Sequence, residues 1–174
     1  MSCTSQIRHI SEVCYPWLLS VWVKTPILRD SEILISSACL PLVDPTVFDE
    51  LSRDRVTLLA CPEREGATYY GKIASIFRSS KLRKLIVATI DGSPHCFTLH
   101  ASVNEAEYIL GERIDREHYV LSSGKLKRIN PDTVRVARYL SLVDEILSRD
   151  PSVIDELSKL SEEYKMARKL YKGG

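Results

Sequence analysis

Three short, continuous runs of apolar residues constrain what this chain can fold into. They span residues 33–35, 56–60 and 85–90 and are rich in β-branched side chains. Continuous rather than alternating hydrophobicity is typical of strands covered on both faces, as in a parallel sheet. Apolar residues at helix-like spacing follow the second run over 69–77 and the third over about 97–110. This alternation predicts an α/β fold with a small parallel sheet and flanking helices.

The remainder of the chain predicts a hairpin and two helices. Residues 118–129 resemble two strands joined by a Ser-Ser-Gly turn. Two helical segments follow, each opened by an Asn-Pro or Asp-Pro pair, and their short connection favours an antiparallel helix pair. We therefore expect an α/β domain with an N-terminal extension over 1–129 and a C-terminal helical hairpin over 130–174 packed on it. The heptad-like apolar spacing of the second helix also suits a homodimer or partner surface.

Charge and hydropathy exclude several classes of protein. The 24 Lys and Arg residues against 23 Asp and Glu residues give a net charge of +1, whereas proteins held by nucleic-acid phosphates usually have a clearly basic surface. The longest apolar run, 17–23, is too short to cross a bilayer. Because the first residues also lack the pattern of a signal peptide, we expect a cytoplasmic protein without a membrane or nucleic-acid partner.

The cysteines are better suited to metal or redox chemistry than to a disulfide framework. Five cysteines occur in the chain, and cytoplasmic proteins seldom contain structural disulfides. The scarcity of Gln and Asn beside abundant Arg, Lys and Glu indicates a thermophile, in which intracellular disulfides become possible. Cys3 and Cys14, near the N-terminus, could form such a disulfide or supply a further ligand.

Three of the cysteines follow the three predicted strands. Cys39, Cys61 and Cys96 would therefore meet at the carboxyl edge of a parallel sheet, where open α/β folds bind ligands. Predicted helices begin after Cys61 and Cys96, and a helix N-terminus favours the thiolate that binds zinc or iron. His95 adds an imidazole, which completes a predicted metal site of Cys39, Cys61, His95 and Cys96. The alternative is that each cysteine is a small buried core residue.

The segment from Cys39 to Gly111 resembles the α/β domain attached to ferredoxin-type modules in a family of anaerobe and archaeal iron–sulfur proteins. The matching motifs are Ala60-Cys61-Pro62-Glu63, Tyr69-Tyr70-Gly71-Lys72-Ile73 and Ser93-Pro94-His95-Cys96. His95 stands where that family has the first of two cysteines, and the ferredoxin module is absent. The resemblance implies an iron–sulfur cluster, or zinc, as the cofactor.

These observations lead to three functional hypotheses. The first is a metal- or iron–sulfur-binding protein with an electron-transfer or redox role and a redox partner protein. The second is a thiol-dependent oxidoreductase, with Cys61 or Cys96 as nucleophile and His95 as base. The third is an interaction module that binds through its terminal helices. His100, one helical turn after Cys96, is a further candidate ligand, and the glycine-rich nucleotide motifs and the Gly-x-Ser-x-Gly motif are absent from the sequence.

Overall fold

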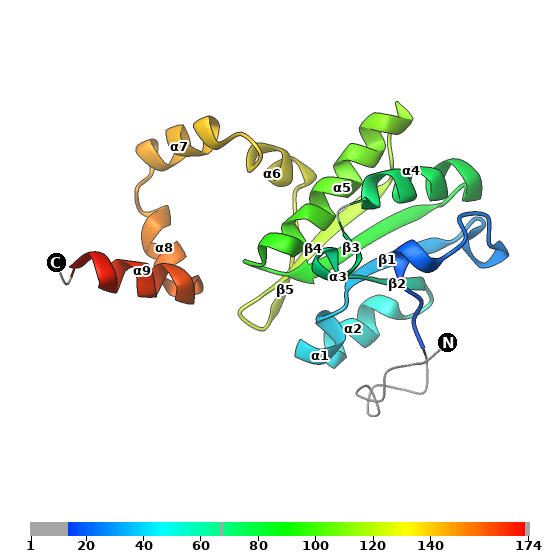
Figure 1. Cartoon of the computed structure of the whole chain (residues 1–174), viewed down its shortest axis with the longest axis horizontal. Coiled ribbons are helices and arrows are strands. Elements are labelled where there is room, and N and C mark those ends of the chain that lie inside the picture. Colours follow the sequence, from blue (N-terminus) through cyan, green and yellow to red (C-terminus); the bar gives the residue numbers. More distant parts are fainter. Residues whose placement is uncertain (1–13, 67, 173–174) are drawn as a thin grey trace. The chain divides into compact units, whose positions relative to one another are not determined.

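The protein is built on a five-stranded sheet. The computed structural model describes residues 14–66 and 68–172. The strands are β1 (Glu32–Ser37), β2 (Val56–Ala60), β3 (Lys84–Ile90), β4 (Arg116–Ser122) and β5 (Lys125–Ile129), in the order β2-β1-β3-β4-β5 (Figure 1). All neighbouring pairs are parallel except β4 and β5, which form the antiparallel hairpin. The predicted α/β fold with a mostly parallel sheet and flanking helices is thus confirmed.

Helices cover both faces of the sheet at β1, β2 and β3, which explains why apolar residues run continuously along these three strands. On one face lie α4 (Tyr69–Ser80) and α5 (Pro94–Leu110), whose buried side chains form one core with alternate residues of β1, β2 and β3. On the other face lie α1 (Leu40–Val43) and α2 (Pro45–Ser52), which contribute Leu40, Phe48 and Leu51 to a second core (Figure 1). Burial on both sides removes the alternation that a half-exposed strand would show.

Short polar caps determine where the helices begin. The Asp44 carboxylate accepts a hydrogen bond from the backbone N–H of Val47 at the start of α2, and the Ser93 hydroxyl accepts one from Cys96 at the start of α5. Pro94 takes the first position of α5, where its missing N–H costs nothing. As a result α5 begins at Pro94 rather than near residue 97, and Cys96 lies within its first turn.

The N-terminal part of the described chain covers the edge of β2. Trp17 forms an isolated parallel bridge with Leu59, and the Leu59 N–H donates to the carbonyl of Pro16 at 2.9 Å. The chain then forms two single-turn 3-10 helices, η1 (Leu18–Ser20) and η2 (Pro26–Leu28). Periodicity in 17–23 could not distinguish a strand from a helix. The segment contains one β-bridge residue, Trp17, and one single-turn helix, η1.

Four helices follow the sheet where the sequence predicts two. They are α6 (Pro131–Val136), α7 (Leu140–Arg149), α8 (Val153–Leu160) and α9 (Glu162–Lys172). Ser161 separates the last two, because its backbone is extended and its hydroxyl accepts a hydrogen bond from the Tyr164 N–H, as an N-cap does. The chain divides into two compact units, Met1–Pro131 and Asp132–Gly174. Over the described residues, every helix is too short or too polar to span a bilayer.

Candidate functional site

The three free thiols of the described chain lie at the same edge of the sheet. Cys39 follows β1 and precedes α1, Cys61 follows β2 and precedes α3 (Pro62–Glu65), and Cys96 lies in the first turn of α5, after β3. Because β2, β1 and β3 are parallel neighbours, the carboxyl ends of all three strands are at this edge. Cys14 is disulfide-bonded, and Cys3 lies outside the described residues.

The thiols are close enough for their charges to interact. Cys39 is exposed, Cys61 is partly buried and Cys96 is buried. The pKa of the Cys39 thiol is raised above its usual value, first because the sulfur is partly shielded from water and then by the negative charges of Cys96, Cys61 and Glu63. Each thiolate thus disfavours another nearby, and a bound cation would remove that repulsion.

A contact with Glu63 connects His95 to the same edge of the sheet. The His95 Nδ1 atom lies 3.5 Å from Oε2 of Glu63, and both side chains are more than half exposed. The Glu63 charge also acts on Cys39, so these side chains form a connected group. An imidazole that contacts a carboxylate through one nitrogen can bind a metal through the other, an arrangement common in zinc sites.

These side chains lie at one edge of the sheet but do not form a preformed metal-binding site. Across residues 14–66 and 68–172, no three His, Cys, Asp or Glu side chains are already placed so that they could hold a metal ion. The structure therefore brings Cys39, Cys61, His95 and Cys96 to one edge, and the closer approach of their donor atoms remains a prediction.

Glu65 fixes the backbone at Cys61, a role that the sequence did not reveal. Its Oε2 atom accepts hydrogen bonds from the Cys61 N–H at 3.3 Å and from the Tyr69 hydroxyl at 2.9 Å. Its Oε1 atom accepts from the Leu19 N–H at 3.2 Å. Burial first, and then the Glu65 hydrogen bond, raise the pKa of Tyr69, so the phenol stays a donor. The turn that carries Cys61 is thereby attached to α4 and to the N-terminal segment.

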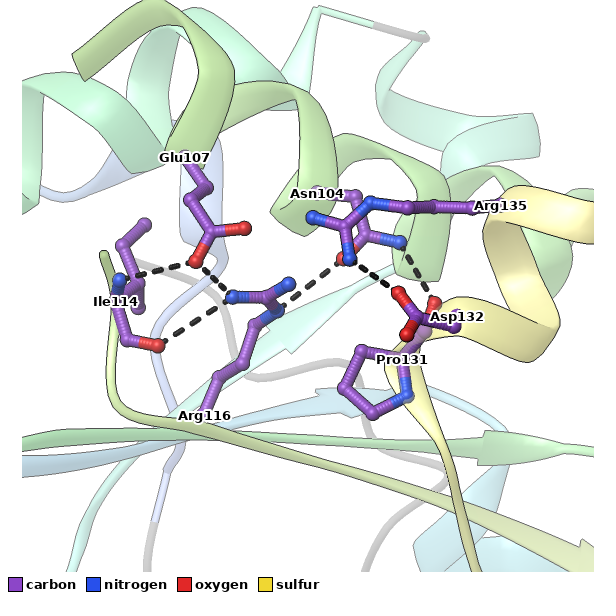
Figure 2. Close-up of polar contacts among 7 residues, drawn as sticks. All are labelled: Asn104, Glu107, Ile114, Arg116, Pro131, Asp132 and Arg135. Atoms are coloured by element: carbon purple, nitrogen blue, oxygen red, sulfur yellow. Dashed lines mark hydrogen bonds and ion pairs between the residues drawn. The ribbon is translucent and has the colours of Figure 1, made fainter. Parts of the chain in front are cut away.

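Buried polar contacts hold α5, and with it Cys96, against β4. Figure 2 shows the Arg116 guanidinium between Asn104 and Glu107. It donates to Oδ1 of Asn104 at 3.1 Å and to the Glu107 carboxylate, whose Oε1 atom also accepts from the Ile114 N–H at 3.2 Å. The Asn104 amide donates to the carbonyl of Pro131 at 3.2 Å. These contacts join α5 to both ends of the hairpin β4–β5.

His100 has a structural partner rather than a place at the thiol edge. Its Nε2 atom is 2.8 Å from the Thr89 hydroxyl, and its Nδ1 atom is 2.9 Å from Nδ1 of His118, with both imidazoles buried. Burial lowers the pKa of His100 to about 4, although the charge of Asp91 opposes the shift. We therefore do not include His100 among the ligands. The pairing with His118 depends on β4 lying beside β3, and no local motif announced it.

Comparison with known proteins identifies the fold family. A family model described as a Rossmann-like domain matches residues 25–171, which is most of the chain. No curated protein and no solved structure matches the sequence. The match agrees with the parallel sheet covered by helices on both faces. The chain therefore belongs to the Rossmann-like domain family.

Proposed function

We propose that this protein binds a zinc ion or an iron–sulfur cluster through Cys39, Cys61, Cys96 and His95. The observation that carries the proposal is that three free thiols follow three neighbouring parallel strands at one edge of the sheet, where the charges of Cys61 and Cys96 act on the Cys39 thiol. Rossmann-like folds support many functions, so the proposal depends on these side chains and not on the family.

The position of the thiols in the sheet supports a ligand site. Open α/β sheets bind ligands outside the carboxyl ends of strands, where the strand order reverses direction. In the order β2-β1-β3 the reversal falls between β1 and β3, and Cys39 and Cys96 follow these two strands.

The donor atoms fit a soft metal. Thiolate sulfur and imidazole nitrogen are ligands of both zinc and iron–sulfur centres, and Glu63 is placed to orient the His95 ring. A cluster would supply one-electron transfer, while zinc would supply structural closure of the edge. With a cluster we propose a role in electron transfer or redox sensing with a redox partner protein, as the resemblance to the iron–sulfur family implies.

Metal analysis of protein purified without oxygen tests this proposal. We expect about one zinc ion per chain in colourless protein, or iron and sulfide in brown protein with thiolate-to-iron absorption. Cys61→Ser should lose the metal because it removes one thiolate, whereas Cys14→Ser should retain it because that cysteine lies outside the set. Circular dichroism would check that both variants fold. Wild-type protein with only trace metal would contradict the proposal.

The helices of the C-terminal unit favour a second candidate, association with another copy of the chain. Neither α7 nor α8 buries a side chain, and Leu140, Leu157 and Leu160 are 78%, 40% and 54% exposed. Most acidic residues of α8 and α9 precede most of the basic ones. The acidic residues are Asp155, Glu156, Glu162 and Glu163, with Lys159 among them paired to Glu156, and the later basic residues are Lys165, Arg168, Lys169 and Lys172. Two antiparallel copies would place opposite charges together.

A charge within this apolar surface should separate the copies. We expect the wild-type chain to show a concentration-dependent dimer in sedimentation, and Leu160→Glu to be monomeric because a carboxylate would be buried without a partner. Tyr108→Glu is the matched control, since it places the same charge at an exposed position on α5. A wild-type chain that stays monomeric at all concentrations would rule out this association.

A further inference from the structure

The loop that leads into β1 presents both apolar and cationic side chains to solvent. Its inward side chains pack on the core beneath α4, and they are Val21, Val23 and Leu28. Its outward side chains include Trp22, Lys24, Ile27 and Arg29. Trp22 and Ile27 are large apolar side chains, yet they are 67% and 65% exposed. Exposed apolar side chains that lie together with cations suit a partner that is both apolar and anionic.

Hydrogen bonds hold this loop against the end of α4 and the start of β3. The Ser80 hydroxyl donates to the carbonyl of Val23 at 2.7 Å, and the Asp30 N–H donates to the carbonyl of Ser80 at 3.0 Å. The Arg83 N–H donates to the carbonyl of Ser31 at 2.9 Å. The loop therefore lies beside the connection from α4 to β3 (Figure 1). Two further exposed cations belong to that connection, Lys81 and Arg83.

Together the two segments form a cationic surface where β1 and β3 begin. We call it the amino-edge surface, and its residues are Trp22, Lys24, Ile27, Arg29, Lys81 and Arg83. The stretches 22–31 and 80–83 contain four cations but a single acid, Asp30. Within the described part of the chain, none of these four cations forms a salt bridge. The net charge of +1 does not reveal this concentration, because it sums over the whole chain.

The backbone at Lys81 is held in an unfavourable conformation. Lys81 follows the last residue of α4 and is left-handed, with a φ of 49°. Glycine is the residue best suited to this position, because any side chain adds steric cost in the left-handed region. Strained backbone of this kind is found at binding sites. Lysine at this position therefore adds a charge to the amino-edge surface while it lowers stability.

We propose that the amino-edge surface binds an anionic lipid bilayer. Lysine and arginine side chains are attracted to anionic head groups. Tryptophan favours the bilayer interface, and an aliphatic side chain such as Ile27 favours the acyl region below it. Single-stranded nucleic acid would also attract the cations, but its bases stack on aromatic rings, and Ile27 offers none. The exposed aliphatic side chain therefore favours lipid.

This surface and the thiols lie at opposite edges of the sheet. Arg29 and Arg83 come just before β1 and β3, whereas Cys39 and Cys96 come after these strands. A bilayer at the amino edge would thus leave the thiol edge open to solvent, and the inference does not depend on a metal. The expectation of a protein without a membrane partner came from net charge and the length of apolar runs, and neither quantity describes a local surface.

Co-sedimentation of the full-length chain with lipid vesicles tests the proposal. We expect binding to vesicles of phosphatidylglycerol and phosphatidylcholine, no binding to phosphatidylcholine alone, and release at high salt. Lys81→Gln combined with Arg83→Gln should weaken binding about thirtyfold, or about fivefold for each cation. Lys125→Gln combined with Lys127→Gln is the matched control. It removes the same charge from exposed positions on β5, outside the surface, and should bind as wild type does.

Two further variants separate binding from folding. Lys81→Gly should bind the same vesicles about fivefold more weakly, yet unfold at a higher urea concentration because glycine relieves the left-handed strain. Poor folding could not then explain the weaker binding. Trp17→Phe leaves Trp22 as the sole tryptophan, since the chain has two. Its emission should shift to shorter wavelength with anionic vesicles, as the indole leaves water.

Several outcomes would overturn the proposal. Wild-type protein that does not bind anionic vesicles would do so, as would equal weakening in the β5 control, which would show a general effect of net charge. Vesicle binding without a shift in Trp22 emission would place the contact elsewhere on the molecule. Binding to single-stranded RNA but not to vesicles would assign the surface to nucleic acid instead.

Discussion

Replacing Arg116 with alanine should lower the free energy of unfolding by about 3 kcal/mol. The Arg116 side chain is only 7% exposed, and its ion-pair partner Glu107 is 17% exposed. Without the guanidinium, the Glu107 carboxylate and the Asn104 amide each lose a donor inside the protein. The cost comes mainly from a buried charge that has lost its opposite, and it exceeds the net stabilisation that the intact pair provides.

The control for Arg116→Ala is the removal of a solvent-exposed ion pair elsewhere in the chain. Arg149 and Glu145 form a salt bridge at 3.2 Å whose side chains are 77% and 60% exposed, so Arg149→Ala should change stability by less than about 0.5 kcal/mol. A double variant, Arg116→Met with Glu107→Leu, should be more stable than Arg116→Ala alone, because it removes both charges. Urea unfolding followed by circular dichroism measures all three. A loss for Arg116→Ala no larger than that for Arg149→Ala would contradict the role of this cluster.

The Arg116 cluster also shows where sequence reasoning reaches its limit. The three apolar runs predicted the sheet correctly because hydrophobicity on both faces of a strand is a local property of the sequence. Arg116, Asn104 and Glu107 instead meet because α5 folds back on β4 (Figure 2). A hydrogen bond between separate elements depends on how those elements pack. Composition and periodicity therefore do not predict such a hydrogen bond.

The position of the three cysteines at one edge was predictable from the sequence, as the sheet was. Once three strands are parallel neighbours, the residues that follow them must share an edge, and Cys39, Cys61 and Cys96 do. The tertiary details behind that edge were not predictable, among them the anchoring of Cys61 by Glu65. The extra residues at the start of α5 had a readable local signal, since Ser93 and Pro94 form a standard cap and first position.

The heptad-like spacing in the last segment was a weaker guide. Apolar residues continue in register across Ser161, yet the helix stops there because the serine hydroxyl bonds the backbone of the following turn. Apolar periodicity indicates which side chains are suited to burial. Local hydrogen bonds determine whether those side chains lie on one continuous helix or on two.

Lowering the pH from about 7 to 5 should reduce the free energy of unfolding by about 2 kcal/mol through His100. In the unfolded chain this imidazole binds a proton near its ordinary pKa of 6.5, whereas in the folded protein burial lowers the pKa to about 4. Between these two pKa values the unfolded chain holds more protons than the folded protein, so acid favours unfolding. The stability that depends on the uncharged His100 ring is fully present only above the unfolded pKa. The charged groups acting on the ring include Asp91, which weakly opposes the shift.

His100→Gln isolates this contribution, because glutamine can hydrogen-bond but does not titrate in this range. We expect the variant to be less stable than wild type at pH 7 and to lose about 2 kcal/mol less between pH 7 and pH 5. Urea unfolding at each pH gives the slopes, and the NMR shifts of the His100 ring give its protonation directly. A ring that titrates near pH 6.5 in the folded protein would contradict the explanation, since Thr89 and His118 would then surround a charged imidazole. A neutral His100 ring at pH 5 would agree with the lowered pKa that follows from burial of this ring against Thr89 and His118.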